Sequence, residues 1–297
     1  MKDISGEDLV SNLKLAAKRD ESHRSVVRVK SHAIGGEGFT VIAGPCAVEG
    51  RDQILEIAGR VKAAGAHLLR GGAFKPLTFP YRNAQTFELG EAGLRYLREA
   101  GDRTALPVVT EVLDVRLVDT VAQYADMLQI GARNMQNFPL LEAVAKTGKP
   151  VLLKRHFGAS LRDWLGAAEY LLYHGNASVA LCERGVAAPH THAPASRFLP
   201  DLAVVPAAQE VTHLPILIDP SHATFRRRWV IPVARAALAV GADGIMVDVH
   251  PDPERAAVDP LQALGFDAFE HLMRQLDAMA PAVGRTLRRA AAVVRDG

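Results

Sequence analysis

Short apolar runs alternate along the chain with longer stretches in which hydrophobic residues recur at helical spacing. The apolar runs occupy residues 39–43, 67–70, 107–111, 127–130, 151–154, 179–182, 216–219 and 244–248. Helical-period stretches include residues 54–64, 91–100, 115–124, 139–147, 161–174 and 229–240, and residues 266–278 follow the last run. Runs that are apolar throughout are typical of strands buried on both faces, as in a parallel sheet. The pattern therefore predicts eight alternations of strand and helix.

A closed barrel is the usual arrangement for eight such alternations, and it takes roughly 250 residues. We therefore expect an α/β protein with the (β/α)8 TIM barrel fold. The alternative is a doubly wound open sheet, which ordinarily carries a Gly-x-Gly-x-x-Gly sequence after an early strand; this sequence is absent here. A short N-terminal extension is expected over residues 1–36, with one short helix near residues 8–18. The barrel is expected over 37–280, and a C-terminal tail over 281–297.

Composition narrows the classes of partner. The 35 Lys and Arg residues nearly balance the 33 Asp and Glu residues, so binding to nucleic acid or to an anionic membrane is not expected. The N-terminus shows no signal-peptide pattern, and no long apolar span is present, so we expect a cytoplasmic protein. Two cysteines are too few for a disulfide scaffold. Cys46, just after an apolar run, is then a metal ligand, a nucleophile or a buried apolar residue.

Cationic residues follow the apolar runs, where the carboxyl ends of barrel strands meet at one mouth. They are Arg70, Lys75, Arg133, Lys154 and Arg184. With few carboxylates to compensate them, these side chains predict a site for phosphate and carboxylate groups. The competing interpretation is a set of ion pairs on the barrel rim.

A second group at the strand ends has the donor atoms of a metal site. Cys46, His222, Asp248 and Asp259 offer one sulfur, one imidazole and two carboxylates. This mixture suits Mn, Fe, Co or Zn better than Mg or Ca. Each residue alone is more often structural, and the interpretation depends on their coincidence at several strand ends.

Seven ordered motifs carry a family resemblance. They are GPC at 44–46, LRGGAFKP at 69–76, QIGARNMQN at 129–137, LKR at 153–155, CERG at 182–185, DPSHA at 219–223 and VHPDP at 249–253. The chain resembles the type I beta subgroup of 3-deoxy-D-arabino-heptulosonate 7-phosphate (DAHP) synthases. The related 3-deoxy-octulosonate-8-phosphate synthases share only some of these motifs.

The resemblance implies a barrel enzyme that condenses phosphoenolpyruvate (PEP) with an aldose phosphate, erythrose 4-phosphate in this family, at the entry of the shikimate pathway. It implies that the five cations named above bind PEP and that Cys46, His222, Asp248 and Asp259 hold a divalent metal. Lys154 and Glu111 are our candidates for orienting water and moving protons, since we expect arginines to crowd Lys154. Cys46 and His222 complete the catalytic set. Relatives assemble as homotetramers or homodimers, and we expect the same here.

The acceptor side departs from the family pattern. Leu77 stands where the family has an arginine that grips the acceptor's phosphate. Thr78, Arg82 and Asp219 are the other residues that we place on this side. Asp248 replaces the family's glutamate, and shortening by one methylene moves the carboxylate back by roughly 1.5 Å.

Three alternatives to an ordinary DAHP synthase follow. The enzyme joins PEP to a different aldehyde; or it is a catalytically silent binding partner; or it is a Schiff-base aldolase that uses Lys154. The five retained cations and the full set of metal ligands argue against a silent protein. A Schiff-base enzyme would not need Cys46 or His222.

Overall fold

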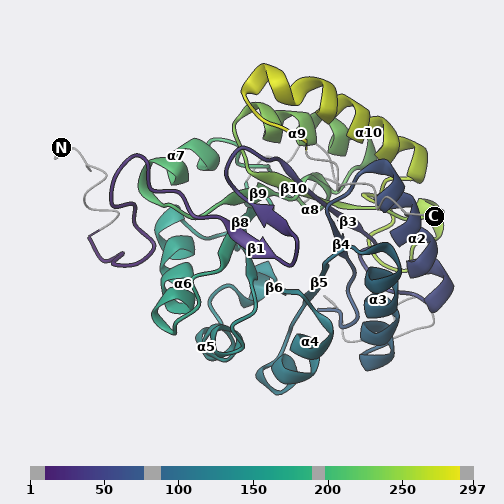
Figure 1. The fold of residues 1–297 in the computed structure, drawn as a ribbon, viewed down its shortest axis with the longest axis horizontal. Coiled ribbons are helices and arrows are strands. Elements are labelled where there is room, and N and C mark those ends of the chain that lie inside the picture. The colour runs from purple at the N-terminus through teal and green to yellow at the C-terminus, as the bar shows by residue number, and fades with distance from the viewer. Residues whose placement is uncertain (1–10, 77–87, 189–197, 288–297) are drawn as a thin grey trace, which may run out of the picture.

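Eight parallel strands close into a barrel in the computed structural model, which describes residues 11–76, 88–188 and 198–287 (Figure 1). In chain order they are β3 (Thr40–Gly44), β4 (Leu68–Arg70), β5 (Val108–Glu111), β6 (Met127–Ile130), β7 (Val151–Lys154), β8 (Val179–Glu183), β9 (Ile216–Ile218) and β10 (Gly244–Asp248). Each strand pairs with the next, and β10 pairs with β3 to close the sheet. The predicted (β/α)8 barrel is confirmed, with a strand in each of the eight apolar runs.

Helices surround the barrel. They are α2 (Arg51–Ala64), α3 (Glu91–Thr104), α4 (Val118–Tyr124), α5 (Phe138–Lys146), α6 (Leu161–Tyr173), α7 (Val204–Val211), α8 (Pro220–Thr224), α9 (Arg227–Ala239) and α10 (Phe266–Met279). Local sequence explains several boundaries. Ser160 and Asp163 form a capping box that starts α6, and Gly65, at φ 100°, ends α2 in the left-handed conformation. In the described part of the chain, no helix is long and apolar enough to cross a membrane.

A two-stranded hairpin, β1 (Val27–Val29) and β2 (His32–Ile34), lies across one opening of the barrel (Figure 1). Val27, Val29 and Ile34 are buried against the apolar side chains inside the barrel. The His32 Nε2 atom lies 3.0 Å from Thr40 Oγ1 at the start of β3. The hairpin therefore covers the amino-terminal opening and leaves the carboxyl-terminal mouth for the site.

The short helix expected near residues 8–18 is wrong for residues 11–18, which form turns, bends and a bridge between Ala17 and Thr212. The Glu169 carboxylate on α6 accepts hydrogen bonds from the backbone N–H groups of residues 14, 15 and 16, at 2.7–2.8 Å. These donors are thereby taken by a distant side chain. Tertiary contact overrides the local helical pattern here.

Candidate active site

A cavity of about 560 Å³ opens at the carboxyl ends of the strands. Its walls include all five cations that the sequence predicted to gather there, together with Glu111, His222 and Asp259. The cavity is also lined by Gln129 and by two aromatic residues, Phe157 and Phe198. The structure thus brings together side chains that are spread over more than half of the sequence.

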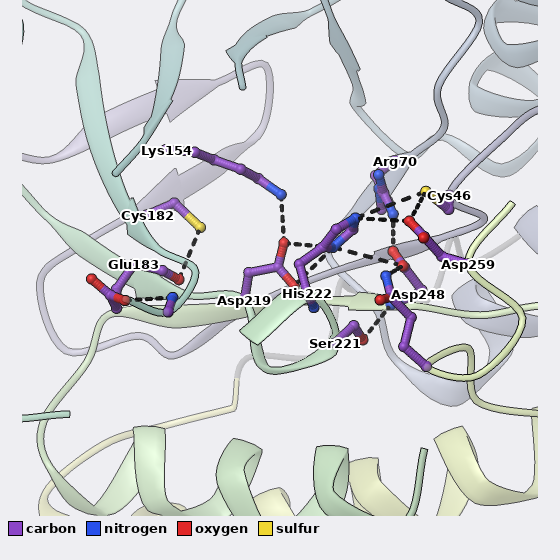
Figure 2. Close-up of polar contacts among 12 residues, drawn as sticks. Cys46, Arg70, Lys154, Cys182, Glu183, Asp219, Ser221, His222, Asp248 and Asp259 are labelled. Atoms are coloured by element: carbon purple, nitrogen blue, oxygen red, sulfur yellow. Dashed lines mark hydrogen bonds and ion pairs between the residues drawn. The ribbon is translucent and has the colours of Figure 1, made fainter. Parts of the chain in front are cut away.

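Three of the four predicted metal ligands meet at one side of this cavity. Cys46 follows β3, His222 lies in α8, and Asp259 lies in the loop after β10 (Figure 2). Cys46 Sγ lies 3.3 Å from Asp259 Oδ2 and 3.8 Å from His222 Nε2, and the latter two atoms are 3.7 Å apart. Two ligands of one tetrahedral zinc-like ion lie about 3.3–3.8 Å apart. The three donor atoms therefore fit a divalent metal in chemistry and in spacing.

Asp219 fixes the orientation of the His222 ring. Its side chain is fully buried, accepts a hydrogen bond from the His222 backbone N–H at 2.9 Å, and lies 2.9 Å from His222 Nδ1. Burial lowers the pKa of His222 to about 4, although Asp219 acts in the opposite direction. The ring is therefore neutral near pH 7. With the proton on Nδ1, the lone pair of Nε2 faces Cys46 and Asp259.

Two of the five cations are paired with buried carboxylates. Lys154 Nζ lies 2.5 Å from Asp219 Oδ2, and Arg70 forms an ion pair with Asp248 (Figure 2). The expectation of few compensating carboxylates is therefore wrong for this pair of cations. Burial opposes ionisation of Asp219, but His222 and Lys154 together hold the pKa of Asp219 well below its usual value. Lys154 has a carboxylate as its partner, and this ion pair was not foreseen.

The other three cations contact carbonyl, sulfur and aromatic groups. Lys75 Nζ donates to the Cys46 carbonyl at 2.8 Å and lies 3.1 Å from Cys46 Sγ. Arg133 donates to the Pro76 carbonyl at 3.2 Å. The Arg184 guanidinium lies 4.5 Å above the Phe198 ring, a cation–π contact. Lys75 thus connects the cation group to the metal-ligand group.

Glu111 reaches the cavity from the end of β5 across a glycine. A Cβ atom at Gly131 would overlap the Glu111 carboxylate. Gly131 has φ −69°, so its backbone conformation does not require glycine. The absence of a side chain at 131 is therefore what gives the carboxylate its place.

Of the residues predicted to bind the acceptor, only Asp219 lies in the described part of the chain. Leu77, Thr78 and Arg82 lie outside the described residues. Asp219 lies beneath Lys154 and His222 and is fully buried, so it supports the site from behind. Phe198, whose ring centroid lies 5.3 Å from that of Phe157, was missed by sequence reasoning.

Asp248 lies outside the three-residue group. It is fully buried and accepts hydrogen bonds from Arg70 and from Gln262 Nε2, the latter at 2.5 Å. Gln262 was also missed, because its role depends on the position of Asp248 and not on a local motif. The ligand role of Asp248 stays a prediction at this point.

The fold and this mouth define a class: a (β/α)8 barrel protein whose cavity combines a group of cations with three donor atoms that suit a divalent metal. The comparisons with known proteins narrow the class. The family model described as the DAHP synthetase I family matches residues 20–283. The chain belongs to this family, and it is an enzyme of the kind that forms carbon–carbon bonds.

Similar proteins include members of two related groups. The chain is 46% identical over 272 residues to a phospho-2-dehydro-3-deoxyheptonate aldolase of Thermotoga maritima, covering 91% of this chain and 78% of the relative. It is 32% identical over 269 residues to a 2-dehydro-3-deoxyphosphooctonate aldolase of Nitrobacter hamburgensis, covering 84% of this chain and 91% of the relative.

Solved structures agree with the barrel. A crystal structure of the Thermotoga maritima DAHP synthase is 45% identical and superposes with a TM-score of 0.86, covering 92% of this chain and 78% of that chain. A truncated form of the Thermotoga maritima enzyme is 44% identical, with a TM-score of 0.83, and the match covers 92% and 98% of the two chains. The confirmed family resemblance therefore extends to the fold.

Proposed function

We propose that this enzyme condenses PEP with an aldose phosphate, erythrose 4-phosphate being the best candidate, and water to give DAHP and inorganic phosphate. The observation that carries the proposal is that the five cations line one cavity together with His222 and Asp259, and that Lys75 also contacts Cys46, the third member of the metal-ligand group. The cations suit an anionic substrate and the metal-ligand group suits a carbonyl substrate, so a reaction between two such substrates needs the two groups side by side. The name of the Thermotoga maritima relative supports the same product.

PEP would occupy the cationic half of the cavity. Its phosphate and carboxylate carry the negative charge that Arg70, Lys75, Arg133, Lys154 and Arg184 together would bind. Guanidinium groups bind such oxyanions through pairs of parallel hydrogen bonds, and the ammonium groups act as point charges. The same cations would stabilise negative charge that builds up on the phosphorylated intermediate and on the departing phosphate.

Cys46, His222 and Asp259 would hold the divalent ion, and Mn, Fe, Co and Zn all suit this donor set. Such an ion supplies Lewis acidity that polarises an aldehyde oxygen. Asp219 would keep the His222 ring turned with Nε2 toward this position, through its contact with Nδ1. The chain's own residues thus prepare the carbonyl end of the cavity.

The reaction forms one carbon–carbon bond and, from water, one carbon–oxygen bond, and it breaks the carbon–oxygen bond between C2 and the phosphate. C3 of PEP attacks the aldehyde carbon, water adds to C2, and phosphate leaves from C2. The proton that the aldehyde oxygen gains and the proton that the water loses must pass through groups in the cavity. Lys154 and Glu111, both on its wall, are the residues we propose for orienting the water and moving these protons.

A second candidate function is the same condensation with a different aldehyde. Phe157 and Phe198 form a stacked pair that adds an apolar surface to the cavity wall. This observation favours a less phosphorylated or more apolar acceptor. Assembly into a homodimer or homotetramer and a cytoplasmic location stay predictions in both cases.

Phosphate release from PEP tests the two candidates together. The enzyme would be incubated with PEP, Mn²⁺ and a panel of aldehydes that differ in phosphorylation and polarity. Fastest turnover with erythrose 4-phosphate is the expected result. Faster release with an unphosphorylated aldehyde would favour the second candidate, and release with none of them would refute both. Borohydride treatment should trap no lysine adduct, because the proposed reaction needs no Schiff base.

A further inference from the structure

We infer that Asp248 is the counter-ion of Arg70 and that the metal is held by Cys46, His222 and Asp259 without it. This inference rests on the proposed function for the presence of the metal, and it assigns a role that differs from the ligand role expected from the sequence. Asp248 stands at the end of β10, and Arg70 at the end of β4. Their side chains form an ion pair next to the donor group (Figure 2).

The position of Asp248 around the His222 ring is the first argument. Asp248 Oδ2 lies 3.7 Å from Nδ1 of His222. The other two donors, Cys46 Sγ and Asp259 Oδ2, face the opposite nitrogen, Nε2. An ion bound by the Nε2 lone pair lies on the side of the ring opposite to Nδ1. Asp248 therefore approaches the imidazole from the side on which a shared metal does not lie.

The hydrogen bonds of Asp248 are the second argument. Its Oδ1 atom accepts from the Arg70 guanidinium and its Oδ2 atom from Gln262 Nε2. Its backbone N–H donates to Ser221 Oγ at 3.0 Å, which ties the end of β10 to α8. Both carboxylate oxygens are thus already engaged, and the backbone is held as well. Turning toward the metal would break both side-chain contacts.

Burial is the third argument. The side chains of Arg70 and Asp248 are 5% and 0% exposed, and a buried guanidinium without a counter-ion is strongly unfavourable. Removing the Asp248 charge leaves Arg70 uncompensated until an anion enters the cavity. Asp259 is different, because its side chain is 16% exposed and lies on the cavity wall. The two aspartates should therefore respond differently to the same substitution.

The test compares Asp248→Asn with Asp259→Asn in metal-free enzyme titrated with Co²⁺, following the thiolate-to-cobalt absorption of Cys46. Asp248→Asn should bind Co²⁺ within about threefold of wild type, whereas Asp259→Asn should bind more than about tenfold less tightly. In thermal melts without metal, Asp248→Asn should be the more strongly affected of the two variants. Asp248→Asn should melt at least about 5 °C lower, and PEP should raise its melting temperature more than that of wild type, because the ligand supplies the missing negative charge.

A second variant covers the case in which Asp248→Asn does not fold. Replacing both charges, as Arg70→Gln with Asp248→Asn, should recover most of the lost melting temperature and keep Co²⁺ binding within about threefold of wild type. The inference is overturned if either Asp248 variant loses Co²⁺ as severely as Asp259→Asn, or if the double variant melts no higher than the single one. Failure of wild type to release phosphate from PEP would refute the proposed function alone, since neither Co²⁺ binding nor the melts depend on turnover.

Discussion

Substitution of Asp219 by asparagine tests the buried centre of the site. The Asp219 carboxylate is fully buried and contacts Lys154 Nζ at 2.5 Å, His222 Nδ1 at 2.9 Å and the His222 backbone N–H at 2.9 Å. Asparagine keeps the shape but removes the charge, and its NH2 group faces a donor. Removing one partner of a buried ion pair costs about 3–5 kcal/mol of unfolding free energy. At about 2 °C per kcal/mol for a chain of this size, the melting temperature falls by about 6–10 °C.

Equilibrium unfolding in urea measures this loss, and Trp164, buried in α6, provides the fluorescence signal. Glu142→Gln is the matched control, because Glu142 forms a 2.7 Å ion pair with Lys146 that is exposed on the surface of α5. It should unfold at nearly the same urea concentration as wild type. Metal affinity gives a second readout, with a loss of about 10- to 100-fold expected for Asp219→Asn. The reasoning is refuted if Asp219→Asn and Glu142→Gln unfold at the same urea concentration.

Three further predictions concern Phe198, Gly131 and His32. Phe198→Leu should raise the KM for PEP about fivefold, because it removes the cation–π contact with Arg184, and such a contact is worth about 1 kcal/mol. Phe198→Tyr keeps an aromatic ring and should leave the KM unchanged. Steady-state kinetics measure both values, and equal KM values for the two variants would contradict this prediction. Gly131→Ala should lower kcat by about tenfold or more by displacing Glu111. Gly59→Ala, inside α2 and with no atom near the new methyl group, should keep kcat and raise the stability by about 1 kcal/mol. Burial, together with a neighbouring histidine, lowers the pKa of His32 to about 4 from 6.5, so the unfolded chain binds an extra proton between these values. The contribution of His32 to the free energy of unfolding should be fully present above pH 6.5 and should fall by roughly 2–3 kcal/mol toward pH 4. Urea titrations at several pH values should show a smaller dependence of the unfolding free energy on pH in His32→Gln.

Sequence periodicity predicted the barrel because each of the eight barrel strands coincides with a mainly apolar run. It failed where tertiary contacts decide local structure. The segment at residues 11–18 is held by Glu169 instead of forming a helix, and the hairpin of β1 and β2 is stabilised by the barrel interior that it covers. Helix α7 was missed as well, since it has only eight residues and includes Pro206 in its first turn.

The sequence predicted which residues lie at the site, but it did not predict which cation pairs with which carboxylate. Strand ends converge in a barrel, so the residue types at those ends indicated cations and metal donors together. Which carboxylate neutralises which cation depends on side-chain directions across the barrel. Arg70 and Asp248 are far apart in the sequence, and only the closed sheet, in which β10 pairs with β3 and β3 with β4, brings them together.

Product formation from PEP and erythrose 4-phosphate with Mn²⁺ tests whether the enzyme is a DAHP synthase. Mass spectrometry would quantify the seven-carbon 3-deoxy-ulosonate phosphate, and a phosphate assay would follow the second product. Wild type should release one phosphate for each DAHP formed, and Cys46→Ser should give neither product above background. Absence of DAHP in wild type while PEP remains intact would contradict it.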